Sequence, residues 1–327
     1  MGQVVRLLQT TALLRAGGLL TVLLLTAGVL LTASCKQELP TDESRSVYYW
    51  RTAFRLTPSE RHFLTAHQVN RMYLRFFDVV TADGQAVPNA TVAFGDSIPP
   101  SMEVVPVVFI TNDCMYQHHD SLASRIARRI VQMCQTHDVH FTGEVQIDCD
   151  WTLSTRNNFF AFLEELRREP SVARLSVTIR LHQLSQPAPP ADRGVLMVYN
   201  TGDFRQLACH KPILDPEAVA PYLHALSSYP LPLAPAYPVF RWDVLFRGDR
   251  YVGILHAPDE LPVLPGDSVA VREPHIDDIL KTKEMVESKL ARNNNTSNSD
   301  AEVVLYDLSP QSIQRFKPND YETIFSH

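Results

Sequence analysis

The sequence predicts an α/β fold, a closed (β/α)₈ or TIM barrel with an inserted loop and hairpin region near residues 245–300. Short apolar segments alternate with amphipathic ones, which is typical of parallel strands joined by right-handed helical crossovers. Eight such strands fall within fewer than 300 residues, and this favours a closed barrel over an open sheet. The chain has 12 glycines and neither a Gly-x-Gly-x-x-Gly nor a Walker pattern, so an open nucleotide-binding sheet is not indicated.

The eight strands are predicted from short runs of apolar, β-branched and aromatic residues bounded by turn signals. In chain order they cover residues 47–50, 72–78, 103–111, 144–150, 174–182, 194–200, 239–246 and 301–306. Helices are expected between them. Thr57, Pro58 and Glu60 form a helix-start signal, and residues 119–136 carry an apolar stripe at helical spacing. The stretch 250–300 fits this repeat least well, so we place the insertion there.

The N-terminal residues have the composition of an export signal. Two arginines precede an uncharged apolar stretch, residues 16–33, and the signal ends in Leu-Thr-Ala-Ser followed by Cys35. Small residues directly before a cysteine resemble the lipobox of bacterial lipoproteins, with Thr32 standing where leucine is commonest. The resemblance implies cleavage before Cys35, acylation of its thiol and anchoring in membrane lipid, and Lys36 implies sorting to the outer membrane of the cell envelope. A plain signal peptide or a retained helical anchor is the alternative.

Three segments follow from this: a signal peptide at 1–34, a lipidated tether at 35–46 and one barrel domain at 47–327. Without the signal, which holds two arginines and no acid, the net charge changes from −6 to about −8. An acidic chain without a Lys/Arg cluster argues against nucleic acid as a partner. The cysteines at 114, 134, 149 and 209 lack metal-binding spacing, so we predict no metal or cofactor, and a Cys114–Cys134 disulfide stays open.

Alternation along two neighbouring strands predicts a polar barrel interior. The apolar set of the fourth strand (Val145, Ile147, Cys149) needs burial under the helices, which turns the other set inward: Gln146, Asp148 and Asp150. The same argument turns part of the fifth strand inward: Ser176, Thr178, Arg180 and His182. Arg75 of the second strand joins them. Buried charges are costly unless paired, so this set is either a structural salt-bridged plug or part of a site.

Active sites of such barrels lie at the C-terminal ends of the strands, so the candidates are residues that close the predicted strands. Asp148 and Asp150 are the candidate catalytic carboxylates. The candidate substrate-binding residues are Trp50, Asp78, Trp151, Arg180, His182, Tyr199, Asn200 and Trp242. Carboxylates flanked by aromatic rings suit sugars, because rings stack on the apolar sugar face while carboxylates accept hydroxyls or handle protons. The predicted ligand is therefore a glycan, with Asp78, Asp113 or Asp203 as a second carboxylate.

The segment 146–152, Gln-Ile-Asp-Cys-Asp-Trp-Thr, resembles the fourth-strand motif of family 18 glycoside hydrolases (chitinase-like), Asp-x-x-Asp-x-Asp-x-Glu. Asp148 matches the middle aspartate, and Asp150 matches the aspartate that orients the substrate acetamido group in that family. The family's proton donor, a glutamate, falls on Thr152, and its first aspartate falls on Val145. This resemblance implies barrel topology more than chitinase activity.

A wider resemblance covers most of the mature chain. The strand that ends at Trp50, the run Tyr-Leu-Arg-Phe-Phe-Asp78, the Gln-Ile-Asp-Cys-Asp stretch and the run Leu-Ser-Val-Thr-Ile-Arg-Leu181 occur in this order. Together they look like a family of uncharacterised exported bacterial lipoproteins with a TIM-barrel domain. That family has no established activity, so it implies fold and location only.

Two functions stay open at this point. In the first, the barrel is a glycoside-hydrolase-like enzyme in which Asp150 is acid/base or orienting residue and Asp148 its electrostatic partner, kept ionised by Arg180 or Arg75. In the second, it is a non-catalytic glycan-binding or scaffold lipoprotein, which Thr152 favours. A metal-dependent hydrolase would draw on His118-His119, His182 and the aspartates, but adjacent histidines diverge where a metal needs converging ligands.

Overall fold

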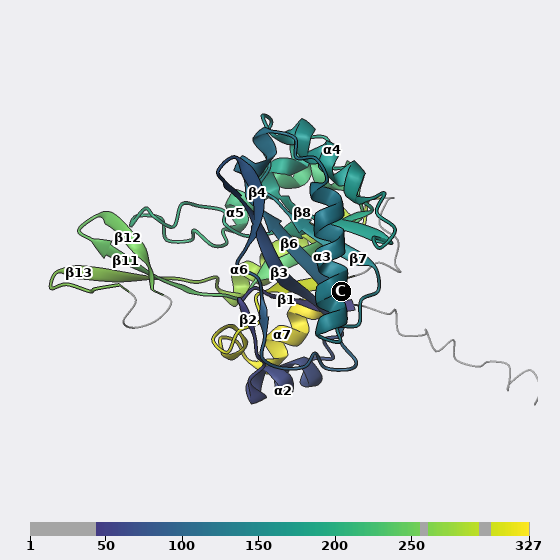
Figure 1. Cartoon of the computed structure of the whole chain (residues 1–327). Coiled ribbons are helices and arrows are strands. Elements are labelled where there is room, and N and C mark those ends of the chain that lie inside the picture. Colours follow the sequence, from purple (N-terminus) through teal and green to yellow (C-terminus); the bar gives the residue numbers. More distant parts are fainter. Residues whose placement is uncertain (1–43, 256–260, 294–301, 327) are drawn as a thin grey trace, which may run out of the picture. The chain divides into compact units, whose positions relative to one another are not determined.

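The computed structural model describes residues 44–255, 261–293 and 302–326 (Figure 1). The chain divides into two compact units, residues 1–41 and 42–327, and every described residue belongs to the second. The predicted signal peptide, Cys35 and most of the tether lie outside the described residues and stay predictions. Within the described ranges, none of the helices has the length and apolar character needed to cross a membrane.

Eight parallel strands form a closed barrel, as predicted. In chain order they are β1 (Ser44–Tyr49), β3 (Arg71–Ala82), β6 (Glu103–Ile110), β7 (Glu144–Asp148), β8 (Arg174–Arg180), β9 (Arg193–Met197), β10 (Leu233–Pro238) and β14 (Glu302–Tyr306). Each strand pairs with the next, and β1 pairs with both β3 and β14, which closes the sheet. The short antiparallel strand β4 (Gln85–Asn89) forms a hairpin with the extended end of β3.

Helices follow most of the barrel strands. They are α2 (Pro58–Ala66), α3 (Leu122–Thr136), α4 (Arg156–Leu166), α5 (Pro216–Val219), α6 (Ile276–Leu290) and α7 (Pro318–Phe325), with 3₁₀ helices η1 (Asn112–Tyr116), η2 (Leu181–Ser185), η3 (Ala220–Ser228) and η5 (Ser312–Gln314). The helix-start signal is confirmed: the side chains of Thr57 and Glu60 bond each other's backbone N–H groups in a capping box. The predicted stripe of α3 is also confirmed, because Leu122, Ile126 and Ile130 are buried. A small parallel pair, β2 (Ala53–Phe54) and β5 (Ala93–Phe94), completes this part of the chain.

Two hydrophobic clusters confirm the predicted alternation. The larger lies between strands and helices and includes Val145, Ile147 and Cys149. The smaller fills the barrel and is made of Tyr48, Tyr73, Val105, Val107, Val195, Met197, Ala234, Ala236 and Val304. The Tyr48 hydroxyl donates to Gln146 Oε1 at 2.6 Å, so the polar face of β7 points inward.

The seventh strand lies elsewhere than predicted. The barrel uses Leu233–Pro238, whereas the predicted run 239–246 mostly belongs to an inserted antiparallel sheet of β11 (Trp242–Arg247), β12 (Arg250–Leu255) and β13 (Asp267–Arg272). Prolines at 230, 232, 235 and 238 argued against predicting a strand here, since proline lacks a backbone N–H donor and is rare in central strands. The expected insertion is thus present, between β10 and α6.

The N-terminal end of the barrel interior holds a buried ionic network that was not predicted. Glu302 of β14 pairs with Arg193 of β9, accepts hydrogen bonds from Ser46 and Tyr73, and lies 3.7 Å from Arg71. Burial raises the pKa of Glu302, but Arg193 and Arg71 outweigh burial, so its pKa lies below the ordinary value. A charged plug therefore exists, but at the opposite end of the strands from the candidate site.

Candidate functional site

One arginine joins both candidate catalytic carboxylates. Arg180, the last residue of β8, donates from Nη2 to Asp148 Oδ1 at 2.9 Å and from Nε to Asp150 Oδ1 at 2.5 Å. Thr178 Oγ1 donates to the same Asp148 oxygen at 2.5 Å. The contact follows from strand register: Ile147 of β7 lies beside Val177 of β8, so Asp148, Thr178 and Arg180 share the inner face.

The two carboxylates lie in different environments. Asp148 is 3% exposed, and burial raises its pKa while Arg180 and Thr178 oppose the shift. Asp150 follows the strand, and its side chain is 59% exposed. Burial lowers the pKa of Arg180, but the two aspartates outweigh burial and raise it above the ordinary value, so the guanidinium stays charged. Of the two carboxylates, Asp150 is therefore the one that solvent or a ligand can reach.

Three aromatic side chains gather at the same end of the barrel. The rings of Trp50 and Tyr306 have centroids 5.8 Å apart, and Tyr199 lies 4.9 Å from Tyr306. They follow or end three different strands, and the ring of Tyr48 lies beneath them, 5.3 Å from Tyr306. Burial raises the pKa of Tyr199 and of Tyr306, so both hydroxyls stay protonated. We call Trp50, Tyr199 and Tyr306 the aromatic trio.

Arg75 and Asp78 hold Trp50 in place. Arg75 Nε donates to Asp78 Oδ1 at 2.7 Å, and Nη1 donates to the Trp50 carbonyl at 3.3 Å. The same guanidinium lies 5.3 Å from the Trp50 ring centroid. A bulge in β3 between Arg75 and Phe77 shifts the strand register. Arg75 and Asp78, which would point to opposite faces of a regular strand, therefore lie close together. Asp78 is buried in this pair, so it positions the tryptophan instead of offering an open carboxylate.

Several predicted binding residues lie away from the aromatic trio. Trp151 is 1% exposed and packs against Phe159 and Phe160 of α4, so it belongs to the core between barrel and helices. His182 was expected inside the barrel, but β8 ends at Arg180 and His182 is exposed on η2. The predicted alternation fails at His182 because β8 ends at Arg180. Trp151 has the parity of Val145, Ile147 and Cys149 and lies on their face, toward the helices.

Asn200 and Trp242 also differ from the prediction. Strand β9 ends at Met197, and Asn200 is exposed with a left-handed φ of 57°. Trp242 opens the inserted sheet, where its ring lies 4.8 Å from Phe240 and 4.9 Å from Phe204. Phe240 contacts both Trp242 and two members of the aromatic trio, Tyr199 and Tyr306. Tyr306 and Phe240 were not among the predicted site residues, although alternation from the inward Val304 places Tyr306 on the inner face.

The position that matches the family 18 proton donor carries a hydroxyl with a local role. Thr152 Oγ1 lies 2.8 Å from Ser154 Oγ, and its backbone N–H donates to Thr155 Oγ1 at 2.9 Å. These bonds order the turn that leads into α4. The further carboxylates proposed from sequence have other partners: Asp203 pairs with Arg205, and hydrogen bonds from Thr111 and Thr81 lower the pKa of Asp113.

The histidines and cysteines offer no alternative site within the described ranges. His118 is half exposed, and His119 Nε2 lies 2.9 Å from the Cys114 carbonyl oxygen. No group of three or more His, Cys, Asp or Glu side chains that could hold a metal ion occurs in residues 44–255, 261–293 or 302–326. The thiols of Cys114, Cys134, Cys149 and Cys209 are free, so the Cys114–Cys134 bridge is absent.

The chain matches no protein-family model and no curated protein. Solved structures do resemble it. The spore cortex-lytic enzyme SleL of Bacillus cereus shares 13% identity with a TM-score of 0.53, over 86% of this chain and 73% of that one. A chitinase from Chromobacterium violaceum shares 13% identity with a TM-score of 0.54, over 86% and 98%. The C-terminal domain of a putative chitinase from Desulfitobacterium hafniense shares 11% identity with a TM-score of 0.53, over 86% and 97%.

At such identities the likeness shows fold alone. It agrees with the distant resemblance to the chitinase-like family 18 barrels, which was read from the fourth strand. The chain has a (β/α)₈ barrel whose fold is similar to the folds of SleL and of the two chitinases.

Proposed function

We propose that this protein binds glycans at the mouth of its barrel and does not hydrolyse them by the family 18 route, and that Cys35 anchors it to the bacterial cell envelope. The observation that carries the proposal is the aromatic trio beside the Asp150–Arg180 pair, with Thr152 in place of the proton donor. A sugar ring stacks its apolar face on Trp50, and its hydroxyls bond to Asp150 and to the tyrosine hydroxyls.

The arrangement of the carboxylates favours binding over cleavage. Glycosidases flank the scissile bond with two carboxyl groups about 5–5.5 Å or 6.5–9.5 Å apart. Asp148 and Asp150 instead come from one strand end and share one arginine, so they approach a sugar from the same side. An ion pair also favours the charged form of a carboxylate, and this opposes its use as a proton donor.

Hydrolysis is the second candidate function, and one observation favours it. Burial raises the pKa of Asp148, which is the direction that a general acid needs. Asp148 would then donate the proton while Arg180 held Asp150 ionised. This function requires turnover that is lost when Asp148 alone becomes asparagine.

The test is a binding and turnover screen of the full chain against a panel of oligosaccharides. Binding is measured by titration calorimetry and turnover by the release of new reducing ends, for wild type, Asp148→Asn and Asp150→Asn. Asp120→Asn is the matched control, because its side chain is fully exposed. We expect binding without new reducing ends, and about tenfold weaker binding for Asp150→Asn, which corresponds to ~1.4 kcal/mol. Reducing ends that disappear in Asp148→Asn support the enzyme, and the absence of any binding overturns the proposal.

The anchor is tested separately. Cells expressing wild type or Cys35→Ser are labelled with a fatty acid and separated into membrane and soluble fractions. We expect label and membrane association for wild type only, since acyl chains supply about 0.8 kcal/mol per buried methylene. An unlabelled wild-type protein would leave the glycan proposal standing without its anchor.

A further inference from the structure

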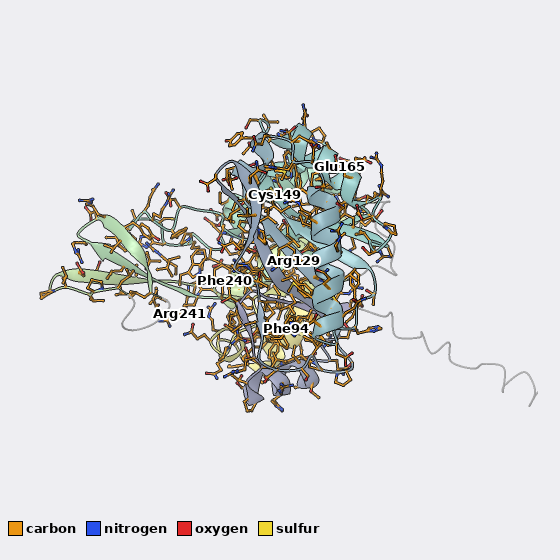
Figure 2. All side chains as sticks on the ribbon, in the orientation of Figure 1. Phe94, Arg129, Cys149, Glu165, Phe240 and Arg241 are labelled. Atoms are coloured by element: carbon orange, nitrogen blue, oxygen red, sulfur yellow. The ribbon has the colours of Figure 1, made fainter. Side chains whose placement is uncertain are left out.

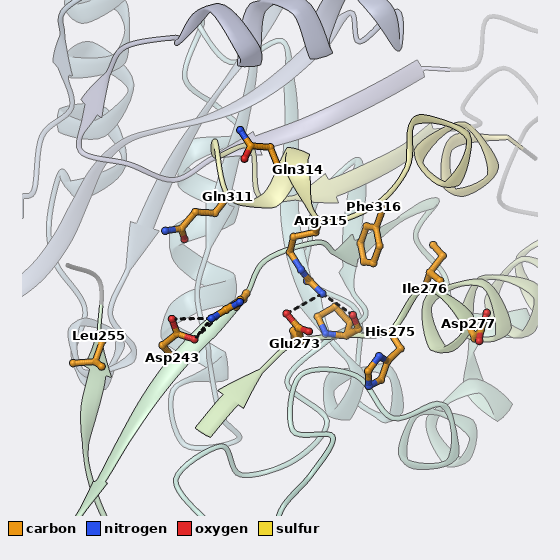
Figure 3. Close-up of a pocket in the computed structure, with 12 residues that line it drawn as sticks. Asp243, Leu255, Glu273, His275, Ile276, Asp277, Gln311, Gln314, Arg315 and Phe316 are labelled. Atoms are coloured by element: carbon orange, nitrogen blue, oxygen red, sulfur yellow. Dashed lines mark hydrogen bonds and ion pairs between the residues drawn. The ribbon is translucent and has the colours of Figure 1, made fainter. Parts of the chain in front are cut away.

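A cavity of about 780 Å³ lies beside the barrel mouth, and none of the residues singled out from the sequence lines it. Its walls come from the inserted sheet, the start of α6 and the segment between β14 and α7 (Figure 3). Side chains that line it and matter here are Arg241, Asp243, Glu273, Gln311, Gln314 and Arg315.

One arginine holds these walls together and links them to the mouth. Arg315 Nη1 donates to the Phe240 carbonyl at 2.7 Å, and Nη2 donates to the Pro274 carbonyl at 2.8 Å. The ring of Phe240 lies 5.8 Å from Tyr306 and 5.7 Å from Tyr199, both of the aromatic trio. Its neighbour Arg241 lines the cavity, and Figure 2 labels both residues where β10 leads into the inserted sheet. Two consecutive residues, Phe240 and Arg241, therefore connect the mouth to the cavity.

Both arginines that line the cavity are already paired, whereas the exposed carboxylate of Asp277, which also lines it, has no ion pair within the described part of the chain. Both Arg241 Nε and Nη2 donate to Asp243 at 3.0 and 2.8 Å, and Arg315 lies 3.5 Å from Glu273. An anionic ligand would compete with Asp243 and Glu273 for the two arginines. Breaking either pair leaves a charge without its partner, which costs free energy where the groups are partly desolvated.

Uncharged hydrogen-bonding groups are still available. Gln311 and Gln314 are exposed, and their side-chain amides have no hydrogen-bond partner within the described part of the chain. Each amide offers two donors and an acceptor, and the paired carboxylates retain unused lone pairs. A neutral ligand rich in hydroxyls can use all of these without breaking an ion pair.

We propose that this cavity is a second saccharide-binding site that takes uncharged units of the glycan bound at the mouth and discriminates against sugars that carry carboxylates. The inference rests on the proposed glycan-binding function and adds the class of glycan. A short oligosaccharide occupies the mouth alone, and a longer one occupies both sites.

The first test compares the full chain's affinity for a neutral disaccharide and a neutral hexasaccharide of the same glycan by calorimetry. The variant is Gln311→Ala/Gln314→Ala, and the control is Gln135→Ala, an exposed glutamine of α3 outside the cavity. We expect the double variant to lose about tenfold affinity for the hexasaccharide and none for the disaccharide. Equal hexasaccharide affinity in variant and control overturns the cavity site while the mouth site stands. If wild type binds neither ligand, the proposed function itself fails.

The second test concerns charge. Asp243→Asn leaves the Arg241 guanidinium without its carboxylate, so an oligogalacturonate hexamer should bind this variant at least tenfold more tightly than wild type. Glu164→Gln, which removes the carboxylate that pairs with the exposed Arg168 just after α4, is the control and should leave that affinity unchanged. Wild-type affinity for the oligogalacturonate that equals its affinity for the neutral hexamer contradicts the proposed selectivity.

Discussion

Replacing Arg180 with methionine leaves the buried carboxylate of Asp148, at the barrel mouth, without its cation. The substitution keeps an unbranched apolar stem but removes the guanidinium from Asp148, which is 3% exposed and 2.9 Å from Arg180 Nη2. Removing one partner of a buried ion pair typically costs about 3–5 kcal/mol, because the other charge stays buried without compensation. Asp150 adds little to this loss, since its carboxylate is mostly exposed and water replaces the arginine.

The assay is urea unfolding of wild type, Arg180→Met, Asp148→Asn and the double variant. We expect the double variant to recover about 2 kcal/mol of the loss, because a neutral amide at 148 no longer needs a cation. Arg168→Met, just after α4, is the control: its pair with Glu164 is exposed, and such pairs contribute about 0–1 kcal/mol.

The stability lost in Arg180→Met should also depend on pH in a defined direction. Burial already raises the pKa of Asp148, and loss of Arg180 raises it further. A carboxyl whose folded pKa exceeds its unfolded value, about 3.9, contributes its full stability below that value and loses it as pH rises through the folded pKa. The deficit of Arg180→Met should therefore be small in acid and grow toward neutral pH. A deficit below about 1 kcal/mol at pH 7, or one that stays constant with pH, would refute the reasoning.

Three further predictions concern binding, pH and packing. Trp50→Ala should weaken glycan binding about tenfold while Trp151→Phe leaves it unchanged, as titration calorimetry can show; equal losses would contradict the assignment of Trp151 to the core. Glu302→Gln should make folding less sensitive to acid. The pKa of Glu302 is lowered, so its carboxylate stabilises the fold above the unfolded pKa of about 4.3, and this stabilisation is lost as pH falls through the lowered pKa. Urea unfolding at a series of acid pH values measures the difference. Gly143→Ala should destabilise the protein by about 1–3 kcal/mol, because φ is 92° there and a new Cβ would lie 2.7 Å from Ala173 Cβ; an unchanged urea midpoint would contradict this.

The fold was largely predictable because local periodicity carries most of the information about a (β/α)₈ barrel. Seven of the eight predicted barrel strands overlap the observed ones, and the inward face of β7 follows from simple alternation. The exception, β10, is rich in proline, and only pairing with β9 and β14 on both sides makes it a strand. Such long-range pairing has no local sequence signal.

The site was predictable only in part. Asp148, Asp150 and Arg180 meet as expected because they sit at the ends of two adjacent strands. His182 was placed wrongly because alternation was extended past the last residue of β8. Trp151 was chosen because it lies near a strand end, although alternation places it on the face of Val145, Ile147 and Cys149, where it is found. Strand ends depend on where the neighbouring strand stops pairing, which a single sequence does not reveal.

The ionic network around Glu302 and the cavity beside Arg315 were not predicted at all. Each joins segments far apart in the chain: Arg193 meets Glu302, and Arg315 contacts the backbone at Phe240 and Pro274. Composition and spacing mark such arginines as charged residues but do not identify their partners.

The most direct test of the central claim is a crystal structure of the full chain with a neutral hexasaccharide. We predict an intact ligand with one sugar ring stacked on Trp50, a hydroxyl bonded to Asp150, and further units in the cavity beside Arg315. A cleaved ligand would contradict the proposal of binding without hydrolysis. An intact ligand bound away from Trp50 and Asp150 would contradict the site.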